Sequence, residues 1–406
     1  MHLDQADIVV VGGGIAGLAT AHSLARRGYD VVLVEQRFLA FGASGRNSGG
    51  VWLQSMSAGA ELDLARQSLG LLRGLEDELG PTFDYVTSGG VFFHETDDQE
   101  RILADFAAER RGLRIATDSI TADEARKLAP GIPETATGAL FFSEDAKLST
   151  SKLVKGLGQS IRKRGVRIYE NTAALSLIRS GDTVVGIRTV RGNIVAGGVV
   201  WCAGPWATNL DSEGIHLPLE LVRVGLLMTQ PIREVLPAMT RGPRGALHVG
   251  PLCALPSFQA DVFAPATEPG KPGYEDVVVQ NGEGNLFVGH TLDAANSLNP
   301  HITMEASRSM IDTILQRRPE YGELGVTGLW AGIVGYTPDK LPIIDHVEGL
   351  YVNTGHSAGA ATGLYGGELT AQLVAGEDPT IPLDSFSARR PGLNTERNPR
   401  YARETV

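Results

Sequence analysis

The sequence predicts an α/β fold, α+β overall, in which a Rossmann-type dinucleotide-binding domain is discontinuous and a second domain is inserted into it. Three observations lead to this prediction. A β-α-β pattern surrounds a glycine-rich turn near the start of the chain, an apolar strand at Val199–Ala203 follows a long stretch of different texture, and a strand, a glycine-rich turn and a helix occupy 350–375. The 406 residues are enough for two such domains.

The first three elements predict a βαβ unit. Ile8–Val11 and Val31–Val34 are short apolar runs of the kind that form buried parallel strands, and Ile15–Arg27 between them has helical composition. Gly28 follows as the residue that ends the helix. We therefore expect a strand, a helix and a second parallel strand at the start of the chain.

The turn inside this unit carries a dinucleotide-binding pattern. Gly12, Gly14 and Gly17 match G-x-G-x-x-G between a strand and a helix. The first glycine permits the tight turn, the second lets the backbone approach a pyrophosphate, and the third lets helix and strand pack closely. Glu35, at the end of the second strand, can accept hydrogen bonds from ribose hydroxyls and disfavours the 2′-phosphate of NADP. The motif alone leaves nicotinamide and flavin dinucleotides open.

Further elements follow in order along the chain. We predict helices at Ala58–Leu79, Asp98–Arg111, Thr121–Leu128, Lys152–Arg164, Thr303–Arg317 and Ala360–Ala375. We predict strands at Val166–Tyr169, Val199–Ala203, Leu219–Thr229, Asp276–His290, Leu329–Gly332 and Leu350–Asn353, and a hairpin of Phe83–Val86 and Val91–Phe93. Gly80-Pro81 should end the first of these helices, and the third begins with a capping-box pattern. The Pro- and Gly-rich segment Arg241–Gly273 predicts an irregular loop or lid.

These elements divide the chain into two interleaved domains and a tail. We expect the cofactor-binding domain to comprise 1–82, 148–217 and 326–388. The second domain should comprise 83–147 and 218–325, and 389–406 should form a polar tail draped on the surface.

Composition and charge exclude several classes of function. A net charge of −11 disfavours binding to nucleic acid phosphates. The two cysteines, Cys202 and Cys253, lie far apart and predict neither a disulfide framework nor a metal site, and we expect Cys202 to be a buried small hydrophobe. We find no signal-peptide pattern and no apolar run long enough for a transmembrane segment, so we expect a cytoplasmic protein.

A loop over 42–51 is built from small residues around one arginine and one asparagine. Small residues let backbone N–H groups face a planar ring or a phosphate, and Arg46 could place a charge beside it. A flexible surface loop is the alternative that composition alone leaves open.

Several motifs in matching order resemble one family. They are Gly-Gly-Gly-Ile-Ala-Gly at 12–17 with Glu35, Ala-Ser-Gly-Arg-Asn-Ser-Gly-Gly at 43–50, Trp-Cys-Ala-Gly-Pro-Trp at 201–206, Leu-Trp-Ala-Gly at 329–332 leading to Tyr-Thr-Pro-Asp at 336–339, and Thr-Gly-His-Ser-Ala-Gly at 354–359. Together they resemble the D-amino-acid oxidase superfamily of FAD-dependent amine oxidoreductases. This superfamily includes glycine oxidases, sarcosine oxidases and their β subunits, D-amino-acid dehydrogenases and opine oxidases.

The resemblance implies an FAD-binding domain and a substrate domain whose large mixed β-sheet covers the flavin. The residues it implies at the AMP and pyrophosphate half are Gly12, Gly14, Ile15, Ala16, Gly17, Glu35, Gln36 and Ala174. Those implied near the ribityl chain and the flavin ring are Ala43, Ser44, Arg46, Asn47, Ser48, Gly49, Gly50 and Gly204, with His356, Gly359, Ala360, Ala361 and Thr362 at the pyrimidine end. The start of the last helix could there stabilise negative charge on the reduced ring.

Three departures from the family pattern bear on chemistry. Val334 stands where many glycine oxidase-like members place an arginine that pairs with the substrate carboxylate, and the sarcosine oxidase β and opine branches often lack that arginine too. No cysteine stands just before Thr-Pro-Asp for covalent attachment, so the resemblance implies non-covalent FAD. Phe287 stands where some members have a lysine thought to activate oxygen, which leaves oxidase and dehydrogenase open.

Candidate residues on the substrate side are His248, His290, Gln280, Arg223 and Tyr336, which are predicted on strands or turns facing the flavin. Our hypothesis is FAD-dependent oxidation of a C–N bond in an amine or N-substituted amino acid, by hydride transfer to flavin N5, giving an imine that hydrolyses. Electrons would pass to O2 or another acceptor, and the chain could form a homo- or hetero-oligomer. The alternatives are a 2-hydroxy acid or polyol dehydrogenase and a flavin-carrying subunit of a hetero-oligomeric oxidoreductase.

Overall fold

The apolar strand before the glycine turn is the centre of the first of two large sheets. The computed structural model describes residues 1–80, 82–263 and 272–394. In it β1 (His2–Val11) pairs in parallel with β2 (Val31–Val34) on one side and with β11 (Gly192–Trp201) on the other. Val9 and Val10 are fully buried. The first sheet therefore joins segments that lie nearly 200 residues apart, as the discontinuous domain predicts.

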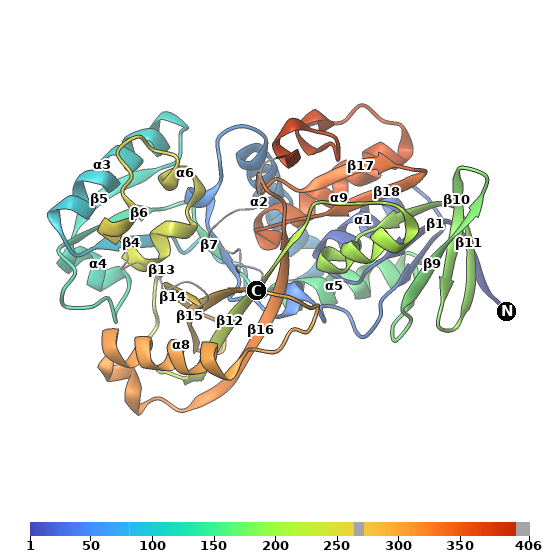
Figure 1. Cartoon of the computed structure of the whole chain (residues 1–406). Coiled ribbons are helices and arrows are strands. Elements are labelled where there is room, and N and C mark those ends of the chain that lie inside the picture. Colours follow the sequence, from blue (N-terminus) through green and yellow to red (C-terminus); the bar gives the residue numbers. More distant parts are fainter. Residues whose placement is uncertain (81, 264–271, 395–406) are drawn as a thin grey trace.

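The remaining strands of this sheet extend it on both sides, in the order β17-β18-β11-β1-β2-β8, with β10 and β9 attached to β11. Their bounds are β8 (Arg167–Tyr169), β9 (Ala174–Ser180), β10 (Thr183–Thr189), β17 (Ile343–Val347) and β18 (Leu350–Thr354). The helices α1 (Ile15–Arg26), α2 (Ala60–Leu79), α5 (Thr150–Lys163) and α9 (Gly359–Ala375) belong to the same half of the molecule (Figure 1). Gly367 of α9 lies against Ala19 of α1, where an added Cβ would be 2.5 Å from the Ala19 Cβ, so these two helices pack closely.

The second sheet follows the order β16-β12-β15-β14-β13-β4-β6-β5. Its strands are β4 (Gly90–His94), β5 (Thr117–Thr121), β6 (Gly138–Phe142), β12 (Glu220–Pro231), β13 (Met239–Arg241), β14 (Gly273–Gln280), β15 (Asn285–Ala294) and β16 (Val326–Tyr336). The helices near it are α3 (Asp97–Gly112), α4 (Ala122–Leu128), α6 (Gly250–Cys253), α7 (Ala260–Phe263) and α8 (Met304–Arg317). A short ladder of β3 (Gly50–Val51) with β7 (Ala146–Lys147) completes the strands. The 3₁₀ turns are η1 (Ala43–Gly45), η2 (Leu53–Ser55), η3 (Gly204–Glu213), η4 (Pro243–His248), η5 (Pro319–Glu323), η6 (Leu383–Phe386) and η7 (Pro391–Asn394).

The helices differ in how they begin. Thr96 and Thr303 cap α3 and α8 with their side chains, and Thr121 forms the predicted capping box of α4 with Glu124. By contrast, α1 and α9 begin after Gly14 and Ala358, and neither of these residues caps its helix with a side chain. In α1 the N–H of Ile15 donates instead to Ser44 Oγ at 3.0 Å, and the other N-terminal N–H groups of both helices are open to further partners.

Three predictions about the strands are wrong. The predicted hairpin at 83–93 does not form, because β4 pairs with β6 and β13, and Val86 bridges Lys147 instead. Long-range pairing here overrides the local turn signal. The single strand predicted at Asp276–His290 is the hairpin of β14 and β15, whose turn is closed by Asn281 Oδ1 accepting from the N–H groups of Glu283 (3.1 Å) and Asn285 (2.8 Å).

The third wrong prediction concerns β16. This strand was expected to open the last part of the cofactor-binding domain, but it pairs with β12 in the second sheet. The chain therefore returns to the first sheet only after Tyr336, with β17. The other domain boundaries stay predictions.

The two irregular segments are only partly described. Within Arg241–Gly273 the chain forms η4, α6 and α7, and residues 264–271 of this expected lid lie outside the described residues. Of the expected tail, 395–406 lie outside the described residues as well. Arg390 and Leu393 before them are buried rather than draped on the surface.

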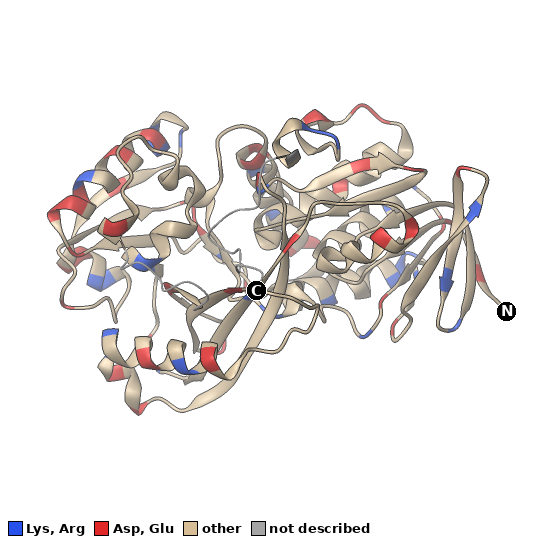
Figure 2. Ribbon diagram, in the orientation of Figure 1, with Lys and Arg blue, Asp and Glu red and all other residues tan. Residues whose placement is uncertain are grey.

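The surface mixes both signs of charge. Acidic and basic side chains are interspersed along α3 and α8 (Figure 2), while the sequence as a whole carries a net charge of −11. Among the described residues, we find no helix that is both long and apolar enough to cross a membrane.

Candidate functional site

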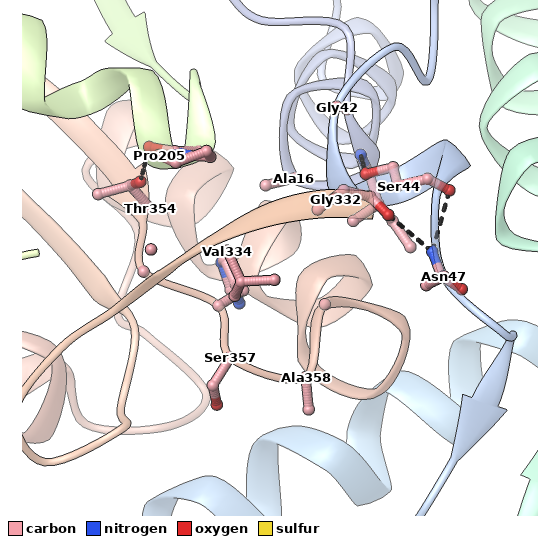
Figure 3. A pocket seen from close by; sticks show the side chains of 18 of the residues that line it. Ala16, Gly42, Ser44, Asn47, Pro205, Gly332, Val334, Thr354, Ser357 and Ala358 are labelled. Carbon is pink, nitrogen blue, oxygen red and sulfur yellow. Dashed lines mark hydrogen bonds between the residues drawn. The ribbon is translucent and has the colours of Figure 1, made fainter. Parts of the chain in front are cut away.

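A cavity of about 380 Å³ extends from the glycine turn after β1 to the second sheet. Residues from both sheets line it, including Gly14 at the start of α1 and Val334 on β16. Figure 3 shows Val334 between the loop that carries Ser44 and Asn47 and the segment that carries Ser357 and Ala358. The cavity therefore has one end at the first sheet, which we call the turn end, and another at the second sheet, which we call the sheet end.

The glycines of the turn end are required by close backbone contacts. Gly12 has φ +112°, and a Cβ added there would be 2.5 Å from the Cys202 carbonyl oxygen. A Cβ on Gly17 would be 1.9 Å from the Gly12 carbonyl oxygen. The turn thus brings backbone to the cavity without side chains, and the N-terminus of α1, which follows Gly14, offers N–H groups and a positive dipole end to an anion.

Glu35 holds this turn in place. Its Oε2 accepts from the N–H of Gly13 at 2.7 Å, and its Oε1 accepts from the N–H of Arg37 at 2.9 Å. Burial raises the pKa of Glu35, although both donors favour the ionised form. The carboxylate also lines the cavity, as a residue that receives ribose hydroxyls would.

The loop 42–51 is ordered by its own side chains. Ser44 Oγ accepts from the N–H of Ile15 at 3.0 Å, which ties the loop to the start of α1. Asn47 Nδ2 donates to the carbonyls of Ala43 (2.9 Å) and Ser44 (3.2 Å), and Asn47 Oδ1 accepts from the N–H of Gly49 at 2.8 Å (Figure 3). The loop is therefore a shaped wall of the cavity, which argues against the flexible surface loop.

Arg46 joins this loop to the second sheet. Its Nε donates to the Phe41 carbonyl at 2.9 Å and its Nη1 to the Ala331 carbonyl at 3.2 Å. Burial lowers the pKa of this guanidinium. The side chain spans the two halves of the molecule beside the cavity.

The start of α9 forms a third wall. His356 Nε2 lies 2.6 Å from Asn353 Oδ1 and Nδ1 lies 2.9 Å from Thr362 Oγ1, so both ring nitrogens are engaged inside the protein. Burial lowers the pKa of His356 to about 4, which keeps the imidazole neutral. Gly359 and Ala360, at the N-terminus of α9, line the cavity.

The sheet end carries a buried cluster of charged side chains. Glu275 on β14 receives Arg241 Nη2 at 3.1 Å on Oε1, and Oε2 lies 2.9 Å from His290 Nδ1. Arg241 Nη1 also donates to Ser55 Oγ at 2.6 Å, and its guanidinium lies over the Trp52 ring, 4.6 Å from the centroid. Glu275 thus holds an arginine and a histidine together at the cavity wall.

Charge and burial compete within this cluster. Burial opposes ionisation of Glu275, but the charge of Arg241 and the hydrogen bond with His290 outweigh it and hold the pKa of Glu275 well below its usual range. Burial, with a smaller contribution from Glu275, raises the pKa of the Tyr336 hydroxyl above its usual value. Tyr336 therefore stays a neutral phenol beside an ionised carboxylate.

The candidate substrate residues separate into two groups. His248, His290 and Tyr336 line the cavity, whereas Arg223 and Gln280 do not. Arg223 precedes Val224, which lines the cavity, so it points to the other side of β12, where Nη1 donates to Asp293 Oδ2 at 2.6 Å. Gln280 lines a separate cavity of about 490 Å³, where its Oε1 accepts from the N–H of Leu236 at 2.8 Å and its Nε2 donates to the Glu234 carbonyl at 2.7 Å.

Comparison with known proteins gives the family. The family model described as FAD dependent oxidoreductase (DAO) matches residues 7–373. The chain belongs to this family. The protein is therefore an FAD-dependent oxidoreductase, and its family includes amine and amino-acid oxidases.

The individual relatives described next are 22–27% identical in sequence to this chain. The oxidoreductase is 27% identical to the glycine oxidase of Pseudomonas aeruginosa over 92% of this chain and 96% of that protein. It is 26% identical to the sarcosine oxidase subunit beta of Rhodobacter capsulatus over 91% of this chain and 84% of that protein. It spans only 41% of the pyruvate dehydrogenase phosphatase regulatory subunit of Mus musculus, at 26% identity over 91% of this chain. The crystal structure of the Geobacillus kaustophilus glycine oxidase matches 96% of this chain and 99% of its own with a TM-score of 0.81 at 22% identity, which gives the same fold.

The residues at the turn end fit FAD. The long cavity, the glycines at positions where a Cβ would clash with backbone, and the N-termini of α1 and α9 suit a pyrophosphate and an extended cofactor. The predicted cofactor residues that line the cavity are Gly12, Gly14, Ile15, Ala16, Glu35, Gln36, Ala43, Ser44, Arg46, Asn47, Ser48, Gly49, Gly50, Ala174, Gly204, His356, Gly359 and Ala360. Gly17, Ala361 and Thr362 lie behind them, as a packing glycine, a core residue and the partner of His356.

Four charged residues of the sheet end are not among the residues that the sequence predicts there. Arg241, Glu275, Glu61 and Lys340 all line the cavity. A signal existed for Glu275, since a carboxylate inside an apolar strand is seldom buried without a partner and so predicts a nearby cation. No comparable signal marked Arg241, which stands at the edge of a segment predicted to be irregular.

Proposed function

We propose that this oxidoreductase oxidises a C–N bond in an amine or N-substituted amino acid, by hydride transfer to flavin N5, giving an imine that hydrolyses. The observation that carries the proposal is the single cavity that joins the FAD-type turn end to the Glu275, His290 and Tyr336 cluster. A substrate at the sheet end would lie against the part of the cavity that the cofactor reaches.

The cofactor and the protein chain have different roles in this reaction. Bound FAD supplies the two-electron acceptor. The chain supplies an apolar wall of Val224, Leu226, Leu292 and Val334 that excludes water, and polar groups that orient a substrate. His290 lines the cavity, and its Nδ1 lies 2.9 Å from Glu275 Oε2, which fixes the orientation of the ring.

The relatives support an amino-acid-like substrate. Glycine oxidase and sarcosine oxidase subunit beta are named for an amino acid and an N-methyl amino acid. Val334 leaves β16 without the arginine that the family resemblance associates with a simple free amino acid. We therefore favour a substrate with a substituent on nitrogen.

One observation favours a second candidate, oxidation of a 2-hydroxy acid or polyol. A hydroxyl proton must leave as the C–H bond breaks, and an imidazole held by a carboxylate is suited to accept it. His290, held by Glu275 at 2.9 Å, has that arrangement. An amine that binds uncharged needs no base for the transfer of the hydride.

The test is anaerobic reduction of the purified, flavin-loaded enzyme. D- and L-amino acids, N-methyl amino acids, opines and 2-hydroxy acids are added in turn, and the yellow flavin absorbance is followed. We expect bleaching by an N-substituted amino acid and not by hydroxy acids. Bleaching by hydroxy acids alone would select the second candidate, and a colourless protein that takes up no FAD would contradict both.

Two repeats of the productive case address the electron acceptor and the partners. Reoxidation in air identifies O2 as the acceptor, and slow reoxidation identifies a dehydrogenase. Full turnover by the isolated chain argues against a flavin-carrying subunit that depends on another chain, the role suggested by a relative named as a subunit.

A further inference from the structure

A second cavity, of about 490 Å³, lies on the other side of the loop 42–51 from the cavity that joins the turn end and the sheet end, which we call the first cavity. The residues that line both cavities are Ser44, Asn47, Ser48, Gly49 and Thr150. The family resemblance places this loop against the ribityl chain and the flavin ring. At these residues, a single layer of protein therefore separates the second cavity from the FAD site.

Both cavities lie against the same face of the second sheet. On β16, Gly332 and Val334 line the first cavity and Trp330 lines the second, and residues two apart along a strand share a face. Arg46 donates to the Ala331 carbonyl at 3.2 Å, and a Cβ on Gly332 would be 3.3 Å from the Arg46 Cβ. The loop therefore crosses β16 at this point and divides one sheet face between the two cavities.

The sheet side of the second cavity is apolar and partly aromatic. Its lining includes Met228, Leu236, Val279, Phe287 and Trp330. The rings of Phe287 and Trp330 meet edge to face, with centroids 6.1 Å apart. A single water needs only about 10–15 Å³ of such volume, so the cavity is far larger than dioxygen requires. Its size and its walls suit a planar organic ring.

Gln280 fixes one wall of the second cavity. Its Oε1 accepts from the N–H of Leu236 and its Nε2 donates to the Glu234 carbonyl, so the segment after β12 is tied to the end of β14. Val235, between these two residues, also lines the cavity and is 74% exposed. The cavity therefore has an ordered wall and opens to solvent beside Val235.

Lys147, on β7, brings an ammonium group to the second cavity. It is the only lysine or arginine among the described residues that line this cavity. Its Nζ donates to the Leu236 carbonyl at 3.4 Å, and an ammonium carries three donors, so a ligand can receive another. Burial lowers the pKa of Lys147, which eases the release of a proton. The carboxylates of Asp84 and Glu283 also line the cavity, but both are ion-paired with Lys152.

We propose that the second cavity binds the electron acceptor of the enzyme, and that this acceptor is a quinone. Two electrons and two protons pass from reduced FAD to the quinone, whose two carbonyl oxygens become hydroxyls, and the flavin returns to its oxidised form. Lys147 donates to one of these oxygens and stabilises the negative charge that gathers there. The inference rests on membership of the FAD-dependent family, and it holds whichever substrate reduces the flavin, because the substrate occupies the first cavity.

The first test measures binding without electron transfer. Duroquinone, a fully methylated quinone that does not add to thiols, is titrated into the oxidised, flavin-loaded enzyme by calorimetry. The variants are Met228→Trp, which fills the second cavity from its wall, and Lys147→Met, with Lys155→Met, an exposed lysine of α5, as the control. We expect Met228→Trp to weaken duroquinone at least about tenfold and Lys147→Met at least about threefold, and the control to stay within about twofold of the wild type.

The second test follows the electrons. The bound flavin is reduced with dithionite without oxygen and mixed with duroquinone in a stopped-flow instrument. The reoxidation rate of the wild type should saturate with quinone concentration, and Lys147→Met should lower the limiting rate at least about fivefold. Reoxidation of Met228→Trp by dioxygen should stay within about threefold of the wild type, because so small a molecule still enters a narrowed cavity.

Three results would overturn the proposal. One is a wild type that does not bind duroquinone or whose reoxidation rate rises with quinone concentration without saturating. Another is a duroquinone affinity within about twofold of the wild type in both Met228→Trp and Lys147→Met. The third is equal slowing of Met228→Trp with duroquinone and with dioxygen, because the substitution then disturbs the flavin itself. Failure of the proposed function is distinguishable, because a flavin that no amine reduces is still reduced by dithionite.

Discussion

The two ends of the cavity differ in the chemical groups that form them. At the turn end, the cavity is lined by backbone: Gly12, Gly14 and the starts of α1 and α9 contribute N–H groups and space. At the sheet end, side chains from separate strands meet, with Arg241 from β13, Glu275 from β14 and His290 from β15. The turn end is thus made of short segments that each act through their own backbone, whereas the sheet end exists only when distant strands are in register.

This difference predicts which amino-acid substitutions each end of the cavity tolerates. A backbone site can lose function through one added methyl group, because its geometry leaves no room. A side-chain site keeps its shape when one charge is exchanged, but it loses the balance between burial and ionisation that held the charges together.

Gly17→Ala should damage the turn end most. The new Cβ would lie 1.9 Å from the Gly12 carbonyl oxygen, so the turn or helix must shift. Overpacking of this kind costs roughly 1–3 kcal/mol, and because the shift falls on the phosphate-binding turn we expect FAD affinity to fall by about 10- to 100-fold. Flavin content per protein and FAD titration of the apoprotein measure it.

The matched control is Gly70→Ala in α2, where an added Cβ has no neighbour within 4 Å. This variant should hold as much flavin as the wild type and be slightly more stable. If both glycine variants retain full flavin content, the turn end does not depend on the close contacts described above.

Glu275→Gln should destabilise the sheet end without emptying the turn end. It leaves the buried Arg241 without its carboxylate, and breaking a buried pair costs about 3–5 kcal/mol. Urea unfolding should show this decrease in the free energy of unfolding. The FAD content of the folded protein should stay unchanged. The exposed Glu100→Gln on α3 should change stability by less than about 0.5 kcal/mol. Equal effects of the two variants would contradict the paired cluster.

Asp145 should give the stability of the protein a pH dependence of its own. It is fully buried, it accepts from Gln54 Nε2 at 2.7 Å, and burial raises its pKa from 3.8 to about 7. The unfolded chain therefore releases this proton at lower pH than the folded protein does. The contribution of Asp145 to stability falls as pH rises from about 4 to about 7, by up to about 1.4 kcal/mol per pH unit, and is constant above that range.

Asp145→Asn removes this titration. The stability difference between the variant and the wild type, from urea unfolding at pH 5 and pH 7.5, should shift in favour of the variant at the higher pH. A difference that stays constant with pH would mean that Asp145 does not titrate in this range.

His356 should give the turn end the opposite dependence. Burial lowers its pKa from 6.5 to about 4, so the unfolded chain takes up a proton before the folded protein does. Its contribution to stability is complete above about pH 6.5 and falls as pH decreases toward 4. His356→Gln should therefore lose less stability than the wild type between pH 7 and pH 5, as measured by unfolding at both values. Parallel losses in the two proteins would contradict a neutral buried imidazole.

The same difference explains what the sequence could predict. The turn end was predictable because the glycine pattern, Glu35 and the loop 42–51 are local, and each residue acts through its own stretch of backbone. The sequence predicts Arg223 and Gln280 at the sheet end, but both lie elsewhere. Neighbouring residues of a strand face opposite sides of the sheet, and a turn divides the single strand predicted at Asp276–His290 into β14 and β15. Arg241 reaches Glu275 only through the pairing of β13 with β14, which no local pattern encodes.

The most direct test of two separable ends is the rate of anaerobic flavin reduction, normalised to bound flavin and followed by stopped flow with the productive substrate. Glu35→Gln and His290→Asn probe the two ends. Glu35→Gln should bind FAD more weakly yet leave the rate per bound flavin within about twofold. His290→Asn should keep its flavin and reduce it at least about tenfold more slowly, because the variant loses a polar group that orients the substrate. A His290→Asn enzyme that loses its flavin but reduces what remains at the wild-type rate would contradict the account.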